Sequence, residues 1–377
     1  MKRFLAVILL FLILPAQAMA GSDEVLSAVI ENAELDEARK WSEELMPDRD
    51  FGETLIGIAK GELTIDGNAL LSKIFELLFS SISGSAAALL SALAPIVLYS
   101  LLTGTENSGR LTRMRTPARL TILFITSLIL SSNIAGMLSL CYETVGNLSS
   151  CMQSIFPVML TIMSAVGSVN SSSLLKPALV AACGSMTAII THVSLPLVSG
   201  AAMLSVAGSV SPRFSLTRLC ALLRNAAAWT LGMAVTVFMG VTAISGLTGA
   251  SLDGVMLRGA KYTIDQFVPV IGGMLSETLE TILGSVLLIK NGIGVMGIVL
   301  LLLVCIGPIL QTAGAALLYT ASAALLEPIA DEAPIKMLDG FGKVLSMLFL
   351  LELGTLAMFI MLLAQVMASM TLGAGVS

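Results

Sequence analysis

The chain has 377 residues, of which 56% are hydrophobic and only 12% are charged, and its formal net charge at pH 7 is −5. A mean hydropathy of +0.94 excludes an ordinary water-soluble domain and predicts a protein that crosses the membrane several times. The excess of acidic over basic residues argues against nucleic acid as a partner.

Residues 1–20 have the three parts of a secretory signal peptide. Lys2 and Arg3 come before an apolar run at 4–14, and small residues follow at positions 16, 18 and 20. The apolar run is shorter than a membrane span, which favours a cleaved signal peptide over an uncleaved anchor. Cleavage leaves the mature N-terminus outside the cytosol.

Residues 21–83 form an acidic segment with 14 acidic and five basic side chains. Apolar residues recur at helical spacing in 22–50 and again in 68–83, which predicts two amphipathic helices, the second lying at the membrane surface. The segment is too small for a substantial core of its own. We therefore expect an extracytoplasmic segment that docks on a partner or on the membrane-embedded part.

Residues 84–377 form the predicted multispan membrane domain, which is all-α. Apolar runs that can cross about 30 Å of hydrocarbon predict about six spanning helices, at 84–103, 119–141, 177–207, 226–248, 291–326 and 344–368. Basic loops stay in the cytosol, so the topology is expected to depend on Arg110, Arg113, Arg115 and Arg119 before the second span and on Arg213, Arg218 and Arg224 before the fourth. This orientation agrees with the one that the signal peptide predicts.

Two further apolar segments are too short to cross the membrane and predict re-entrant hairpins. The first begins at Pro157 and ends at a polar tip, Asn170, Ser171 and Ser172, and the second begins at Pro269. About 13 residues of helix reach only ~20 Å, which is less than the hydrocarbon thickness. The irregular tip of such a hairpin must be buried in protein or line water.

The spacing of the prolines indicates a duplication. Pro157 lies 39 residues before Pro196, and Pro269 lies 39 residues before Pro308. Each unit would contain a span, a hairpin and a kinked span, and would therefore keep its orientation. The sequence predicts a tandem parallel repeat of 110–217 and 218–330.

The segment after Pro269 carries the candidate functional residues. Glu277, Glu280 and Lys290 lie in an apolar sequence, although each charged side chain at mid-membrane costs about 2.5–3.5 kcal/mol. Small and polar residues recur there at every fourth position and form one stripe on a helix. The candidate residues are Asp265, Gly272, Gly273, Ser276, Glu277, Glu280, Thr281, Gly284, Lys290 and Asn291. Three interpretations stay open, namely a packing seam between helices, a polar path or gate, and an interfacial helix.

No motif indicates an enzyme. The sequence lacks a phosphate-binding loop, a dinucleotide fingerprint, a zinc-protease motif and a nucleophile elbow in a supporting context, so we expect no catalysis and no cofactor. The cysteines have no metal-ligand spacing, so no metal site is expected. Cys141 and Cys151 flank a short loop and could pair in an oxidising space, but free buried thiols are favoured.

Several stretches are distinctive as sequences. They are RGAKYTIDQFVPVIGG at 258–273, Glu277 with Thr278, LLIKN at 287–291, LLEP at 325–328 and FSLTRL at 214–219. Together with the layout of signal peptide, acidic segment and multispan body, they resemble the stage III sporulation protein AE family of endospore-forming bacteria. The resemblance extends over essentially the whole chain past residue 20.

The resemblance implies a subunit of the trans-envelope complex that links mother cell and forespore. Its partners would be the other stage III sporulation A proteins and, from the forespore side, stage II sporulation protein Q. It would lie among the lipids of the mother-cell membrane and support late forespore gene expression, and self-association in a homo-oligomer is compatible with this role. The rival interpretation is an autonomous secondary transporter that binds an ion or small solute through Glu277, Glu280 and Lys290.

Overall fold

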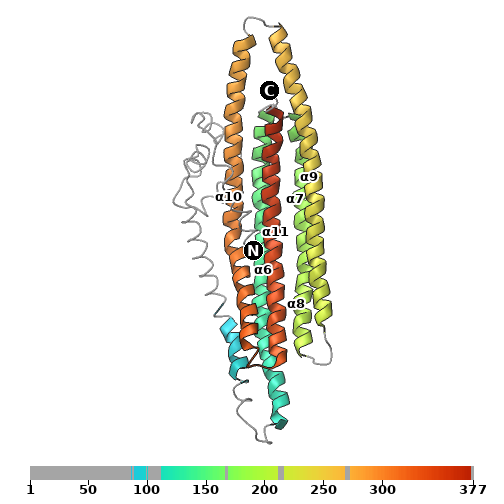
Figure 1. The fold of residues 1–377 in the computed structure, drawn as a ribbon, viewed down its shortest axis with the longest axis vertical. Coiled ribbons are helices and arrows are strands. Elements are labelled where there is room, and N and C mark those ends of the chain that lie inside the picture. The colour runs from blue at the N-terminus through green and yellow to red at the C-terminus, as the bar shows by residue number, and fades with distance from the viewer. Residues whose placement is uncertain are drawn as a thin grey trace.

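The structure, a computed structural model, describes residues 86, 89–98, 100, 112–165, 169–210, 216–267 and 272–374. The elements in these ranges are helices, which confirms the predicted all-α class (Figure 1). After a short apolar helix at Leu89–Leu98 they are α6 (Thr112–Ala165), α7 (Val169–Ile189), the π-helical turn η1 (Ile190–Ser194), α8 (Leu195–Val210), α9 (Thr217–Phe267), α10 (Gly272–Leu326) and α11 (Glu332–Ala374). The predicted signal peptide and acidic segment lie outside the described residues.

Five helical stretches in the described part are long and apolar enough to cross a membrane. They are Leu120–Pro157, Val180–Gly208, Thr217–Val241, Val304–Leu326 and Glu332–Met367. Each of them overlaps one of the predicted spans. Of the predicted span at 84–103, the structure describes mainly the short helix Leu89–Leu98. The chain is therefore a polytopic membrane protein.

Helix α11 is the central helix of the bundle. It packs against α10, α9, α6 and α8, and Figure 1 shows it running between α10 on one side and α7 to α9 on the other. In its most apolar stretch 56% of the residues are buried, against 17% in α9. A helix that is apolar on all sides is stable when neighbouring helices surround it. The core of the protein therefore follows α11.

Helices α7 and α8 form one continuous helix that is interrupted only by η1. Pro196 has no N–H for the carbonyl of His192 and its ring would clash with that carbonyl, so an ordinary α-helical turn is disfavoured there. The helix instead widens by one residue, and the N–H of Leu195 donates to the carbonyl of Ile190. The proline therefore accounts for the π-helical turn.

Single polar contacts connect the helices around this turn. The Tyr142 hydroxyl on α6 donates to the Thr191 carbonyl at 3.3 Å. The Ser194 and Thr230 hydroxyls are 2.9 Å apart and join η1 to α9. Helices in lipid gain little from burying apolar surface, so close packing and such hydrogen bonds hold them together.

Neither re-entrant hairpin is confirmed. Helix α6 continues through Pro157 for a total of 54 residues, or about 81 Å, and α10 runs unbroken for 55 residues, or about 83 Å. The chain does reverse between Ala165 and Val169, but it does so between two long packed helices, and Asn170, Ser171 and Ser172 lie in the first turn of α7. The prediction was made by measuring each apolar segment against one bilayer thickness, whereas these helices are far longer than the bilayer is thick.

The tandem repeat is not confirmed either. The first predicted unit contains α6, α7 and α8, and α6 packs along both of the other helices. Helix α9 packs mainly on α7, α8 and α11, while α10 packs mainly on α11 and α6. The two helices of the second predicted unit therefore pack less on each other than on α11, unlike those of the first.

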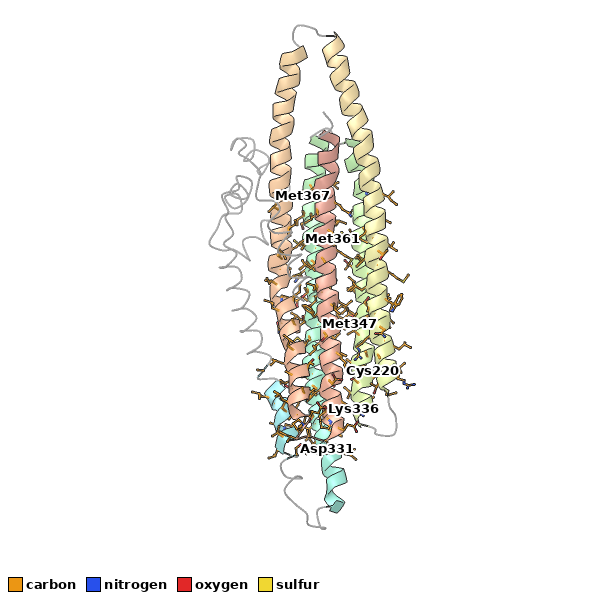
Figure 2. All side chains as sticks on the ribbon, in the orientation of Figure 1. Cys220, Asp331, Lys336, Met347, Met361 and Met367 are labelled. Atoms are coloured by element: carbon orange, nitrogen blue, oxygen red, sulfur yellow. The ribbon has the colours of Figure 1, made fainter. Side chains whose placement is uncertain are left out.

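Basic residues gather at one end of the bundle. Helices α6, α9 and α11 all begin at this end (Figure 1), with Arg113, Arg115 and Arg119 in the first turns of α6 and Arg218 and Arg224 in the first turns of α9. Lys336 and Lys343 lie near the start of α11, and Figure 2 shows Lys336 at the same end as Cys220 of α9. Arg110 and Arg213 lie outside the described residues.

Candidate functional site

The residues of the predicted polar stripe lie in the first part of α10 and, for Asp265, in the last turn of α9. Their backbone is helical, and their side chains lie outside the described residues. The predicted span 291–326 on the same helix is about 54 Å long and is more than enough to cross the hydrocarbon. Glu280 lies 11 residues, or ~16 Å, before this span along the helix. A bilayer placed on 291–326 therefore leaves Glu277 and Glu280 outside it.

Described glycines just after this stripe lie in a helix contact. A Cβ atom added at Gly297 would lie 3.2 Å from Leu363 of α11 and 3.3 Å from Ile155 of α6. Because Gly297 has no side chain, α10 can approach both helices closely. This favours the packing-seam interpretation for the neighbouring residues, whose own side-chain contacts stay a prediction.

A different polar site lies inside the bundle, where α10 faces α11. Thr312 Oγ1 on α10 donates a hydrogen bond of 2.7 Å to Glu352 Oε2 on α11. Both side chains are fully buried, with no exposed surface (0%). Among the described residues Glu352 is the one acidic or basic side chain in the core.

The local sequence places both partners. Thr312 lies one turn after Pro308, and its hydroxyl is also 3.2 Å from the Pro308 carbonyl and 3.1 Å from the Ile309 carbonyl. A threonine hydroxyl has one hydrogen, and the carboxyl oxygen is its closest acceptor. On the other side, a Cβ at Gly354 would lie 3.0 Å from Leu231 of α9. Close packing on both sides of α11 therefore holds Glu352 against α10.

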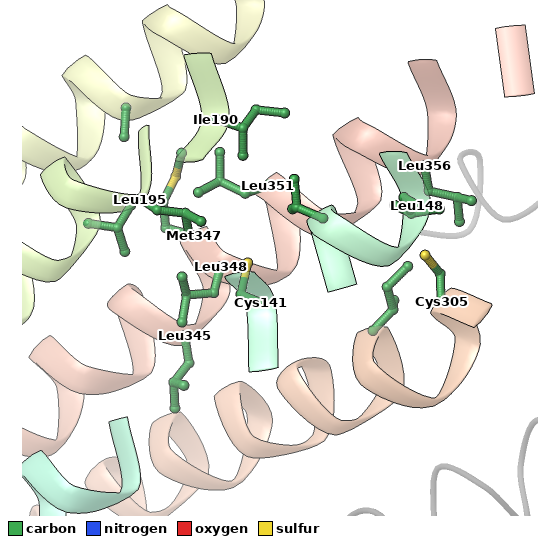
Figure 3. Close-up of a cluster of buried hydrophobic side chains, with 14 of the residues drawn as sticks. Cys141, Leu148, Ile190, Leu195, Cys305, Leu345, Met347, Leu348, Leu351 and Leu356 are labelled. Carbon is green, nitrogen blue, oxygen red and sulfur yellow. The ribbon is translucent and has the colours of Figure 1, made fainter. Parts of the chain in front are cut away.

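Two thiols complete the site. Cys141 on α6 and Cys305 on α10 are fully buried and lie within electrostatic range of the Glu352 carboxyl group. Figure 3 shows both sulfur atoms among leucine side chains of α6 and α11, including Leu148 and Leu348. All five cysteines are free and buried, which confirms the favoured prediction of free thiols. Cys141 and Cys151 both lie within α6 and do not pair.

The Glu352 carboxyl group receives too few hydrogen bonds to stabilise a full negative charge. Glu352 Oε1 accepts no hydrogen bond of ordinary geometry from a described residue, although the Cys141 thiol lies beside the group. A thiol is only a weak donor. The described lysines of α11 pair elsewhere, Lys336 with Glu332 and Lys343 with Asp339. A carboxyl group inside a membrane bundle without a basic partner is costly, and such residues commonly mark functional sites.

The sequence analysis did not select Glu352, although its signal was present. It is the one charged residue of the predicted span 344–368, and a lone charge in an apolar span indicates function by itself. Its partner could not be found that way. Thr312 lies 40 residues earlier, and only the packing of α10 on α11 brings the two together.

The comparisons with known proteins agree on one family. A family model described as stage III sporulation protein AE matches residues 49–370. The protein named stage III sporulation protein AE of Bacillus subtilis (strain 168) is 24% identical over 299 residues, which cover 79% of this chain and 75% of that protein. No solved structure gives a significant match.

Proposed function

The chain belongs to the stage III sporulation protein AE family, and from this premise we propose that it is a membrane subunit of a sporulation-specific, secretion- or channel-like complex between mother cell and forespore. It would lie in the mother-cell membrane around the forespore, with its mature N-terminus outside the cytosol. Its role would be to support sporulation and late forespore gene expression. Several helices that can span a membrane support this proposal.

The observation that carries the proposal is the length of α9 and α10. Both helices continue past the C-terminal end of α11, at the end of the bundle opposite the basic residues (Figure 1). In α9, 19 residues follow the predicted span 226–248, which corresponds to about 28 Å of helix. We call this part of α9, with the facing first part of α10, the extension. If the basic end is cytosolic, the extension reaches into the space between the two membranes.

The partners are proposed from the family resemblance. They are the other stage III sporulation A proteins and, across the intermembrane space, stage II sporulation protein Q. Through the extension, the protein can contact these partners in the intermembrane space while its bundle stays in the mother-cell membrane. The acidic segment 21–83 would lie on the same side, because it follows the predicted signal peptide.

A matched shortening of the extension tests the proposal. Deleting residues 250–267 and 272–289 removes 18 residues, or about five full turns, from each helix and keeps the remaining faces in register. We expect the shortened protein to reach the membrane at normal abundance but to lose co-purification with the other stage III A proteins and to block sporulation. Unchanged co-purification would contradict the role of the extension.

The autonomous transporter is less well supported than the complex. It was inferred from paired re-entrant hairpins, which the structure does not confirm. Purified protein in liposomes separates the two functions. Ion-coupled solute uptake without partners would favour the transporter, whereas no uptake together with co-purification of sister subunits would favour the complex.

A further inference from the structure

The buried Glu352 carboxyl group has no positive charge to balance it among the described residues. The titratable groups that face it are the Cys141 thiol of α6 and the Cys305 thiol of α10, and neither can supply a positive charge. The nearest described lysine on its own helix, Lys343, lies nine residues away, or about 13 Å, and pairs with Asp339. A carboxylate enters an apolar bundle only if a cation accompanies it or it is otherwise neutralised.

The surroundings of Glu352 offer the atoms that bind such a cation. Glu352 Oε2 and the carbonyl oxygens of Pro308 and Ile309 all lie 2.7–3.2 Å from Thr312 Oγ1. Carboxylate, hydroxyl and carbonyl oxygens are the ligands that hard cations prefer. Glu352 Oε1 is buried and has no donor of ordinary hydrogen-bond geometry among the described residues, and the Cys141 thiol beside the carboxyl group is only a weak donor.

Pro308 adds a second feature of cation sites. Because proline has no N–H, the carbonyl of Val304 loses its usual helical donor. Val304 precedes Cys305, which lies within electrostatic range of the carboxyl group. Although α10 stays unbroken at Pro308, a backbone carbonyl without its helical donor is free to serve as an oxygen ligand for a cation.

We propose that Glu352, with Thr312, forms a binding site for a monovalent cation, either a proton or Na⁺, between α10, α11 and α6. Occupancy of the site balances the buried charge and so controls how tightly α11 packs on α10. The site lies in the bundle and not in the extension. The proposed cation site can therefore be tested independently of the proposed contacts with sister subunits.

The test uses the purified full chain in detergent. The wild type is compared with Glu352→Gln, which keeps the shape and removes the charge, and with Glu332→Gln, an exposed carboxyl group on the same helix that serves as the control. The infrared C=O stretching band of a protonated carboxyl detects a bound proton. The rise of Tm with NaCl, measured against choline chloride at constant ionic strength, detects bound Na⁺.

A carboxyl band that is present in the wild type and Glu332→Gln but absent from Glu352→Gln assigns a proton to the site. A Na⁺-specific rise in Tm that Glu352→Gln alone loses assigns Na⁺. The Thr312→Val variant keeps the carboxyl group, so it tests the site even if Glu352→Gln fails to fold. It should shift the carboxyl band or raise the half-saturating Na⁺ concentration about tenfold, because one oxygen ligand is lost. The proposal is overturned if the wild type shows neither signal, or if Thr312→Val leaves both signals unchanged.

Discussion

The hydroxyl group of Thr312 donates a 2.7 Å hydrogen bond to the carboxyl group of Glu352, and solvent reaches neither side chain. This contact joins the two helices that pack most extensively on each other, α10 and α11. A purely apolar contact would hold the same helices together at less cost. A carboxyl group at this position therefore points to a functional requirement.

The first prediction separates function from stability at Glu352. Replacing a weakly compensated buried charge by an apolar side chain of similar volume is neutral or stabilising by about 1–4 kcal/mol. Glu352→Leu should therefore keep or raise the Tm of the purified protein but block sporulation. A fall in Tm together with loss of the protein from membranes would instead give Glu352 a structural role.

Close packing at a glycine of α11 gives the second prediction. A Cβ at Gly342 would lie 2.6 Å from Thr320 Oγ1 and 3.2 Å from the Thr320 backbone nitrogen, whereas a Cβ at the exposed Gly136 would have no neighbour within 4 Å. Gly342→Ala should destabilise the protein by about 1–3 kcal/mol through overpacking. Gly136→Ala should stabilise it by up to about 1 kcal/mol, because alanine favours a helix. Thermal unfolding in detergent measures both changes, and equal shifts would contradict the described packing of α11 on α10.

The third prediction concerns the π-helical turn. Alanine at position 196 supplies the N–H that Pro196 lacks, so Pro196→Ala should convert η1 to regular α-helix and rotate the preceding part of the helix by about 100° relative to α8. The contact between Ser194 and Thr230 should then be lost. Cysteines introduced at both positions should form a disulfide under mild oxidation in the wild-type background and fail to do so with Pro196→Ala. Equal disulfide yields would show that the proline does not cause the turn.

Thiol labelling of intact, non-sporulating cells that carry the protein in their plasma membrane tests the orientation. The Lys336 side chain is exposed near the start of α11, and Ser251 lies in the extension. A cysteine at 336 should resist an impermeant thiol reagent, and a cysteine at 251 should react with it, because the basic end is expected to face the cytosol. The reverse labelling would place the extension in the cytosol and would remove the proposed access to forespore partners.

Much of the fold could be predicted from the sequence because hydropathy is a local property. The spans at 119–141, 177–207 and 344–368 depend only on runs of apolar residues, and each overlaps a described apolar stretch. The continuity of helices could not be predicted in this way. Pro157 and the polar residues after Pro269 predicted breaks, but α6 continues through Pro157, and α10 runs unbroken for 55 residues.

The candidate site was less predictable than the fold. The polar stripe in α10 was chosen because its charges lie in an apolar sequence, and it stays a prediction because its side chains lie outside the described residues. Glu352 could have been selected as a lone charge within a span. The identity of its neighbours, Thr312, Cys141 and Cys305, depends on contacts between helices distant in the sequence, for which no single sequence carries a signal.

The most direct test of the central claim is photo-crosslinking in sporulating cells. A photoreactive amino acid is placed at Ser251 in the extension or, for comparison, at Trp229, which is 73% exposed on the apolar stretch of α9. The account predicts that position 251 forms an adduct with another stage III sporulation A protein and that position 229 does not. Adducts from position 229 alone, with none from the extension, would contradict the claim that this subunit meets its partners outside the membrane.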